Sequence, residues 1–170
     1  MSDLSHIDEN GRARMVDVSA KAATARTARA EGALVCRTAT LDAALAGTTP
    51  KGAVISTAEI AGVMAAKRTA ELIPLCHPLA LSHVGVELQV LADGVEIVAS
   101  AETTAQTGVE MEALTAASVA ALTVYDMAKA IDKQMTFFVE LLEKVKGDVG
   151  LTESPKSEPP AWPAAEAGRQ

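Results

Sequence analysis

The sequence predicts an α+β fold in which helices cover one face of an antiparallel sheet. Stretches that alternate apolar and polar residues, typical of half-buried strands, are separated by stretches typical of helices. Their order is strand, helices, strand, strand, helix, strand, which is the order of a split βαβ unit. The chain has 170 residues, about the length of one domain. We therefore expect a single domain over 1–150, with a polar N-terminal arm at 1–15.

The first half of the chain predicts one strand and two helices. The segment TARTARAEGALVC at 24–36 shows no helical stripe and ends in strand-favouring residues, so we expect a strand there. A short helix follows at 40–46, and Gly47 ends it. A longer helix is expected over 57–72.

Local signals set the limits of this longer helix. Thr57 is a suitable N-cap, and Pro74 prevents the helix from continuing. We expect its apolar side to be formed by Ile60, Val63 and Met64.

A hairpin is predicted in the middle of the chain. Residues 82–92 alternate between apolar and polar side chains, which indicates a half-buried strand. The pair Asp93–Gly94 is a typical hairpin turn, and the alternation resumes at 95–99 on the returning strand.

The last part of the fold is predicted as a loop at 103–108, a helix at about 111–131 and a strand at 135–141. This order leaves one face of the sheet without helices. Leu91 and Val98 lie on that face, which indicates that another subunit covers it.

Composition narrows the class of protein. Apolar residues make up 49% of the chain but aromatic residues only 2%, so the core must be aliphatic. The net charge of −7 argues against nucleic acid or an anionic membrane as partner. No signal pattern is visible, so we expect a cytoplasmic protein in which Cys36 and Cys76 stay reduced. The Pro- and Glu-rich segment 151–170 is expected to be a disordered tail.

The run LIPLCHPLALSH contains two prolines, a cysteine and two histidines. It lacks the paired Cys and His spacings of a zinc site, so we expect no metal. Adjacent residues on an extended segment point to opposite sides, so Cys76 and His77 form a poor nucleophile–base pair. Two interpretations remain, a buried turn or a pocket wall formed by the main chain of Leu75 and Cys76 with the His77 imidazole. His83 is expected to be structural.

Cations are the second candidate group. Scattered Lys and Arg residues are usually a solvated surface, but they are also the groups that bind a polyphosphate. Arg26 and Arg29 flank the first strand, and Lys51 lies in the turn sequence TPKG. The full set is Lys21, Arg26, Arg29, Lys51, Lys67 and Arg68.

Carboxylates at both ends of the long helix are the third group. Glu110 and Glu112 bracket Met111 at the start of this helix. One interpretation is structural, because the helix dipole favours acids there. The other is functional, because a carboxylate can accept two hydrogen bonds from a guanine-like ring. Asp126 and Lys129 share a helix face as an exposed ion pair or as an acid–base pair.

The spacing of these groups limits what one chain can do. Residues 112 and 126 are 14 positions apart, or about 21 Å along a helix at 1.5 Å per residue. Either one group is structural, or a second chain completes the pocket. We prefer the second interpretation.

Three segments resemble the cyclic pyranopterin monophosphate synthases, the molybdenum cofactor biosynthesis accessory protein C family. They are MVDVSAK at 15–21, AAKRTAELIPLCHPL at 65–79 and TGVEMEALTAASVAALTVYDMAKA at 107–130, and the resemblance extends over about 4–144. It implies a ferredoxin-like fold, a homohexamer built as a trimer of dimers, and no metal or organic cofactor. It also implies a lyase that converts 3′,8-cyclo-7,8-dihydro-GTP, made by an upstream radical enzyme, to cyclic pyranopterin monophosphate and diphosphate.

The resemblance also assigns roles to residues of this chain. The implied catalytic residues are Asp126, Lys51 and Lys129. The implied substrate-binding residues are Leu75, Cys76, His77, Met111 and Glu112, with Glu110 nearby, and the phosphate-binding cations Lys21, Arg26 and Lys67 or Arg68.

One region departs from the family pattern. Family members commonly carry a basic residue and a Gly-Gly-Lys-Ser-Gly tail after the last strand, whereas this chain has Glu140 and KVKGDVG at 144–150. Lys144 and Lys146 could supply charge there. The alternative function is a non-catalytic nucleotide-binding regulatory domain on the same fold. An RNA-binding sheet is disfavoured because its aromatic stacking residues are almost absent.

Overall fold

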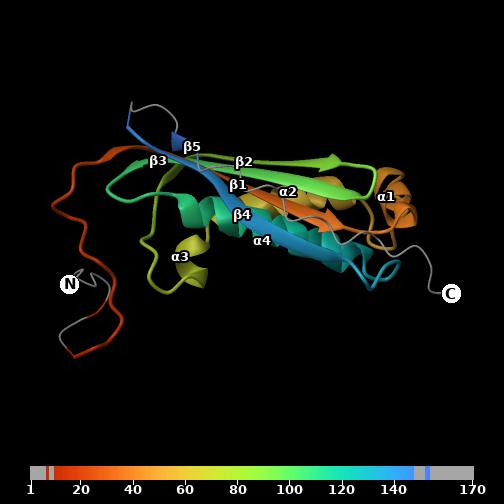
Figure 1. The fold of residues 1–170 in the computed structure, drawn as a ribbon, viewed down its shortest axis with the longest axis horizontal. Helices are drawn as coiled ribbons and strands as arrows, with labels where there is room; N and C mark the ends of the chain where they lie inside the picture. Colours follow the sequence, from red (N-terminus) through yellow and green to blue (C-terminus); the bar gives the residue numbers. More distant parts are fainter. Residues whose placement is uncertain (1–6, 8–9, 148–151, 154–170) are drawn as a thin grey trace.

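The computed structural model describes Ile7, residues 10–147 and residues 152–153. Its sheet contains β1 (Thr24–Val35), β2 (Leu81–Val90), β3 (Gly94–Ala105), β4 (Thr136–Lys146) and the two-residue β5 (Thr152–Glu153). Its helices are α1 (Thr38–Leu45), α2 (Val54–Ala66), α3 (Thr69–Leu72) and α4 (Glu110–Ala128). Figure 1 shows their arrangement.

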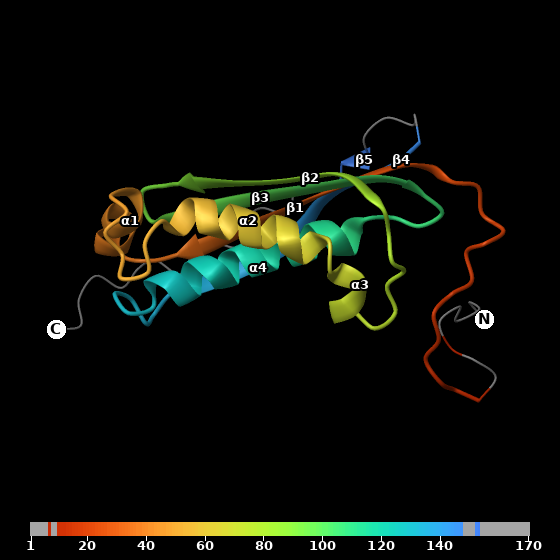
Figure 2. The same ribbon diagram turned by 180° about the vertical axis from the view of Figure 1, so that it is seen from behind.

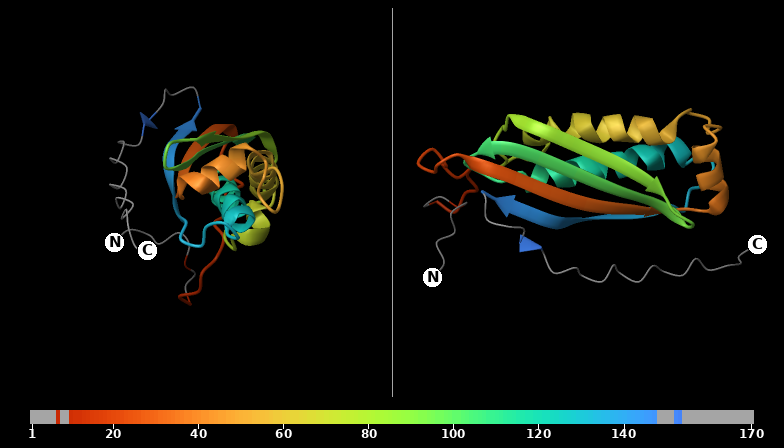
Figure 3. Two further views of the ribbon diagram at one scale, coloured as in Figure 1. Left: turned by 90° about the vertical axis from the view of Figure 1, so that its right-hand side faces the viewer. Right: turned by 90° about the horizontal axis from the view of Figure 1, so that it is seen from above.

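The sheet is antiparallel, with strand order β2-β3-β1-β4-β5. Helices α2 and α4 lie side by side on one face of it (Figures 2 and 3). The predicted α+β fold is therefore confirmed, and the order of its four long strands is that of a ferredoxin-like sheet. No helix among the described residues is both long and apolar enough to cross a membrane.

The predicted hairpin is also confirmed. The Leu91 N–H donates to the Gly94 carbonyl at 2.8 Å. Gly94 pairs with Val35 across the sheet, and a Cβ at Gly94 would lie 2.2 Å from the Leu34 carbonyl oxygen. This close approach of two backbones explains why a glycine follows Asp93.

The core is aliphatic, as predicted, but alanine supplies much of it. Where α2 crosses α4, a Cβ on Gly62 would lie 2.9 Å from the Ala116 carbonyl oxygen. Small residues thus bring the two helices close together. The buried residues of α2 are Val54, Ala58, Gly62, Ala65 and Ala66.

This packing corrects the predicted apolar side of α2. Ile60 and Met64 are 63% and 49% exposed, and Val63 is only partly buried. Ile60 and Met64 point outward because larger side chains would hold α2 away from α4, whereas Val63 packs against the edge of the core. The exposed Ile60 and Met64, together with Leu122 of α4, leave apolar surface on the helical side of the molecule.

Three predicted boundaries are wrong. The helix expected over 57–72 begins at Val54 and ends at Ala66, and the separate short α3 follows. Thr57 lies inside α2 and donates its hydroxyl hydrogen bond to the Ala53 carbonyl, so it does not cap the helix. Strand β3 continues to Ala105, so the loop predicted at 103–108 begins as strand.

Both ends of the chain lie partly outside the described residues. Within the predicted N-terminal arm, Ile7 and Ala13 form an isolated β-bridge. Within the tail predicted at 151–170, Thr152 and Glu153 pair with β4, and the rest of that segment is outside the described residues. Leu91 lies in the turn after β2 and is 42% exposed, and the cover of the open sheet face by another subunit stays a prediction.

Candidate functional site

A cleft of about 400 Å³ lies at the N-terminal end of α4. Four segments form it: residues 16–21 before β1, the loop between α3 and β2, the loop after β3 and the first turn of α4. It is lined by Val16, Val18, Lys21, Leu75, Cys76, His77, Leu79, Thr107, Gly108, Glu110, Met111 and Glu112. Seven of the residues predicted to bind substrate therefore share one cleft.

His77 connects the loop between α3 and β2 to the segment 16–21 that precedes β1. Its Nε2 lies 2.8 Å from the Val16 carbonyl oxygen. Because a carbonyl only accepts, Nε2 must carry the proton, which leaves Nδ1 as the acceptor in the neutral ring. The Cys76 N–H donates to the Ile73 carbonyl at 3.1 Å, which holds the turn behind the histidine.

Cys76 is not arranged as a nucleophile. Burial raises the pKa of its thiol, and the negative charge of Glu112 raises it further. No hydrogen bond joins its sulfur to His77 among the described contacts. Both Cys36 and Cys76 are free thiols, as predicted.

Glu112 is the buried acid of the cleft, with 4% exposure. Burial raises the pKa of its carboxyl, hydrogen bonding to its own backbone N–H lowers it, and the charge of Glu110 raises it. The net pKa is raised although the first turn of α4 favours negative charge. Burial therefore outweighs the helix dipole at this position.

Glu110 folds back over Gly108. A Cβ at Gly108 would come within 1.9 Å of the Glu110 Oε2 atom, so the glycine makes room for this carboxylate. The Glu110 Oε1 atom is 3.4 Å from Lys144 Nζ.

A second pocket, of about 210 Å³, adjoins the cleft and shares Gly108 and Glu110 with it. Its other lining residues are Arg26, Thr27, Lys144, Val145 and Lys146. Arg26 lies opposite Lys146 in the pairing of β1 with β4. The Arg26 guanidinium donates to the Gln106 carbonyl at 3.3 Å, while its buried Nε has no hydrogen-bond partner among the described residues. The pocket can therefore accept an anion next to the cleft.

The other predicted phosphate-binding residues lie elsewhere. Lys67 lines a depression of about 480 Å³ between α2 and β2, together with His83. Arg68 is the exposed N-cap of α3, and Arg29 is exposed on β1. Within one chain these three cations do not join the cleft.

The predicted catalytic residues form a separate cluster at the C-terminal end of α4. Asp126 accepts from Lys51 Nζ at 2.5 Å and from Lys129 Nζ at 2.7 Å. Hydrogen bonds from Lys129 and then Lys51 lower the pKa of Asp126 to about 2, and Asp126 raises the pKa of Lys129. About half of each side chain is exposed, so this cluster is open to solvent.

A tight turn presents Lys51 to this cluster. The Thr49 hydroxyl donates to the Gly52 carbonyl at 2.6 Å, and Gly52 has φ of 87°. The predicted turn at TPKG is confirmed, as is the shared face of Asp126 and Lys129. The contact of Lys51 with Asp126 could not be predicted from spacing, because the two residues are 75 positions apart in the sequence.

The two sites stay apart within one chain. Glu112 and Asp126 lie on the same continuous helix, which separates them by about 21 Å along its axis. A side chain cannot close that distance. Within the described part of the chain, no group of three or more His, Cys, Asp and Glu residues could hold a metal ion.

Fold and site together define an α+β protein that can bind a small anionic molecule in a cleft containing cations, acids and an imidazole. The MoaC family model matches residues 15–147. Cyclic pyranopterin monophosphate synthase of Novosphingobium aromaticivorans is 54% identical over 167 residues, covering 98% of this chain and all of that protein. This chain belongs to the MoaC family.

Other relatives carry the same description. Cyclic pyranopterin monophosphate synthase of Roseiflexus castenholzii is 55% identical over 153 residues, covering 88% of this chain and 97% of the relative. Cyclic pyranopterin monophosphate synthase 3 of Mycobacterium tuberculosis is 59% identical over 149 residues, covering 86% of this chain and 84% of the relative.

Proposed function

We propose that this protein is a cyclic pyranopterin monophosphate synthase, a lyase of molybdenum cofactor biosynthesis. The observation that carries the proposal is that relatives of this description match nearly the whole chain, including every segment that lines the cleft. The substrate is 3′,8-cyclo-7,8-dihydro-GTP from an upstream radical enzyme. The products are cyclic pyranopterin monophosphate and diphosphate.

The anion-accepting side of the cleft binds the triphosphate. Lys21 lies in the cleft, and Arg26 lies in the adjoining pocket with an unpartnered buried N–H. Charged donors held in place stabilise the negative charge that grows on diphosphate as it leaves. Lys144 and Lys146 place further positive charge in the same pocket, in the region where the chain departs from its family.

The opposite side of the cleft orients the purine-derived ring. Glu112 offers a buried carboxylate that can accept two hydrogen bonds from a guanine-like edge. His77 is held by Val16 and offers Nδ1. The main chain of Leu75 and Cys76 and the Met111 side chain complete the wall, with Glu110 beside them.

Proton transfer falls to the cluster of Lys51, Asp126 and Lys129. Ring opening and pterin closure each need protons to be removed and returned, and Lys51 and Lys129 are the groups that carry them. Asp126, whose pKa is lowered to about 2, stays ionised and holds both lysines in place. Because α4 keeps this cluster away from the cleft of its own chain, we propose that a second subunit supplies it. The assembly we propose is a cytoplasmic homohexamer, a trimer of dimers.

The direct experiment supplies the purified protein with 3′,8-cyclo-7,8-dihydro-GTP, without added metal, and follows pterin formation and diphosphate release. We expect both products in equal amounts. Tight binding with recovery of unchanged ligand would instead support the non-catalytic, nucleotide-binding alternative.

Subunit mixing tests the shared site. Glu112→Ala and Asp126→Ala proteins are each expected to be inactive. If they exchange subunits at random, about a quarter of the shared sites combine an intact cleft from one chain with an intact cluster from the other, and activity returns to that extent. Normal assembly of the mixture without recovered activity would contradict a site made by two chains.

A further inference from the structure

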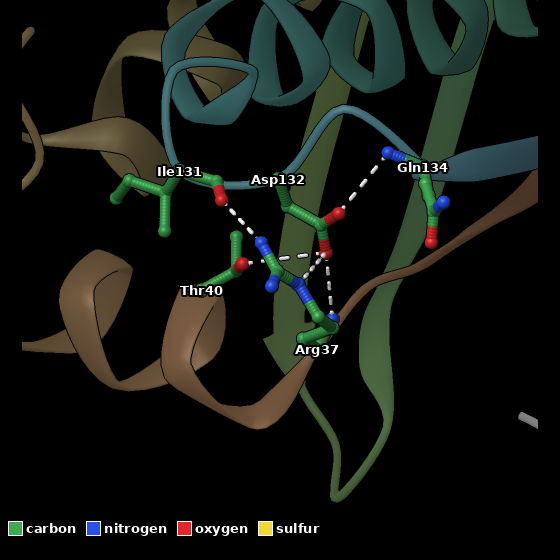
Figure 4. Close-up of polar contacts among 5 residues, drawn as sticks. All are labelled: Arg37, Thr40, Ile131, Asp132 and Gln134. Carbon is green, nitrogen blue, oxygen red and sulfur yellow. Dashed lines mark hydrogen bonds and ion pairs between the residues drawn. The ribbon is translucent and has the colours of Figure 1, made fainter. Parts of the chain in front are cut away.

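A buried carboxylate, that of Asp132, follows Lys129 by three residues in the chain, and Figure 4 shows its polar contacts. Asp132, in the turn between α4 and β4, is 2% exposed. Its Oδ2 accepts from the Arg37 N–H at 2.9 Å and lies 3.3 Å from Arg37 Nε. Its Oδ1 accepts from the Gln134 N–H at 3.1 Å. The Thr40 hydroxyl is 3.5 Å from Oδ2.

These contacts hold the start of α1 against the turn after α4. Arg37 is the N-cap of α1, and its own side chain does not cap the helix. Asp132, which is distant in the sequence, therefore accepts a backbone hydrogen bond at the start of α1 and places a negative charge there, which the helix dipole favours. The Arg37 guanidinium also donates to the Ile131 carbonyl in the same turn.

The two segments held by Asp132 each adjoin a part of the chain that contains one of the lysines. Lys129, the C-cap of α4, lies three residues before Asp132, and the N–H groups of Ile131 and Asp132 donate to the Ala128 carbonyl. The other end of α1 leads into the Lys51 turn, where the Thr48 N–H donates back to the Ala43 carbonyl at 3.0 Å. Asp132 is therefore linked to Lys129 through the turn after α4 and to the Lys51 turn through α1.

We propose that Asp132, together with Arg37, is a positioning residue that holds the Lys51 turn and the end of α4 in the geometry that lets both lysines bind Asp126. Asp132 itself contacts neither lysine in the described contacts. Burying the Asp132 charge costs free energy, and its contacts with Arg37 and Gln134 offset that cost. The same contacts hold the two segments together. The expected effect of Asp132 on kcat rests on the proposed function. Its expected effect on the contacts between Asp126 and the two lysines does not.

The geometric test measures Asp126 directly. In the full-length protein, the 13C carboxyl resonance of Asp126 should titrate with a pKa of about 2, against an ordinary value of 3.8. In Asp132→Ala, looser lysine contacts should move that pKa toward 3.8. Removing the negative charge of Asp132 alone would move it the other way, so the direction separates positioning from a simple charge effect.

The kinetic test compares turnover with substrate binding. We expect kcat of Asp132→Ala to fall about 10- to 100-fold, since misplacement of a reacting group from a distance has effects of this size. KM should change less than about threefold because neither Asp132 nor Arg37 lines the cleft. Arg37→Gln should show both effects more weakly. Its side chain is 63% exposed, so this variant keeps the test valid if Asp132→Ala fails to fold.

Two controls isolate the effect. Lys133→Gln removes a charge from an exposed neighbour in the same turn and should leave kcat and the Asp126 pKa unchanged. Val86→Ala removes a buried side chain from β2 and loses stability without moving either readout. Folded Asp132→Ala or Arg37→Gln with the parent pKa and kcat would overturn the inference. A fully active Lys129→Ala would instead reject the catalytic role of the cluster, while the Asp126 titration still tests the positioning.

Discussion

Glu112→Gln separates the stability cost of the buried acid from its use. The side chain is 4% exposed, and its burial raises the pKa of the carboxyl from an ordinary value of 4.5. A raised carboxyl pKa means that folding favours the protonated form, so the ionised group costs stability above the folded pKa. Glutamine has the same shape without the charge. We therefore expect the free energy of unfolding of Glu112→Gln at pH 8 to equal or exceed that of the parent.

The pH dependence of this difference follows from the same pKa. As the pH falls from 8 through the raised pKa toward 4.5, the parent takes up a proton on folding and its carboxyl becomes neutral. The advantage of the glutamine variant should shrink over that interval and stay constant below it. Urea unfolding at several pH values, followed by circular dichroism, measures both curves. Glu71→Gln, an exposed site on α3, is the control that should show no such interval.

The activity of Glu112→Gln should fall, although its free energy of unfolding should not. Losing a hydrogen bond between the substrate ring and a charged acceptor costs about 1.5–3 kcal/mol, which corresponds to a roughly 10- to 150-fold lower kcat/KM. The assay is pterin formation at limiting substrate. The reasoning would be refuted if Glu112→Gln lost more than about 1 kcal/mol of stability at pH 8 with normal kcat/KM, because Glu112 would then be a structural acid.

Three further changes test other parts of the site and fold. Arg26→Met should raise KM about 10-fold or more through loss of a phosphate contact. Urea unfolding should show a loss of about 0.5–1.5 kcal/mol, since the variant loses the hydrogen bond to the Gln106 carbonyl; an unchanged KM would contradict phosphate binding there. Gly62→Ala should lose about 1–3 kcal/mol of stability in the same assay, because the new methyl would lie 2.9 Å from the Ala116 carbonyl oxygen; parent stability would show that the helices can separate freely. Cys76 should react with iodoacetamide at pH 8 more slowly than the same thiol in the urea-unfolded chain, because burial and Glu112 raise its pKa; a faster reaction would indicate an activated thiol.

The order of elements was predictable because strand alternation and the Asp93–Gly94 turn are local signals. The packing of α2 was not. Pattern reading assigns the largest apolar residues to the core, and here Ile60 and Met64 are exposed while Ala58 and Gly62 are buried. Only the close crossing of α2 with α4 decides that outcome. In an alanine-rich chain, helical stripes of large residues are therefore a weak guide to the buried face.

The site divides in the same way between local and distant information. The spacing of Asp126 and Lys129 predicted their shared face, and the acids at the start of α4 were visible as first-turn residues. The contact of Lys51 with Asp126 spans 75 positions and depends on the fold. Asp132 gave no signal because it stands with two other polar residues, Lys133 and Gln134, in a turn, and its burial arises only where α1 meets the end of α4.

The length of α4 connects these observations to the need for a partner. A continuous helix of 19 residues is rigid and cannot fold back, so the cleft at its start and the lysine cluster at its end stay separated in every conformation that preserves it. Side-chain motion changes positions by a few ångströms, far less than about 21 Å along the axis. The cluster is half exposed, as expected for a group whose substrate arrives from outside its own chain. The exposed Ile60, Met64 and Leu122 supply apolar surface that a neighbouring copy could bury. If both ends of α4 act on one substrate molecule, assembly is therefore part of the catalytic mechanism.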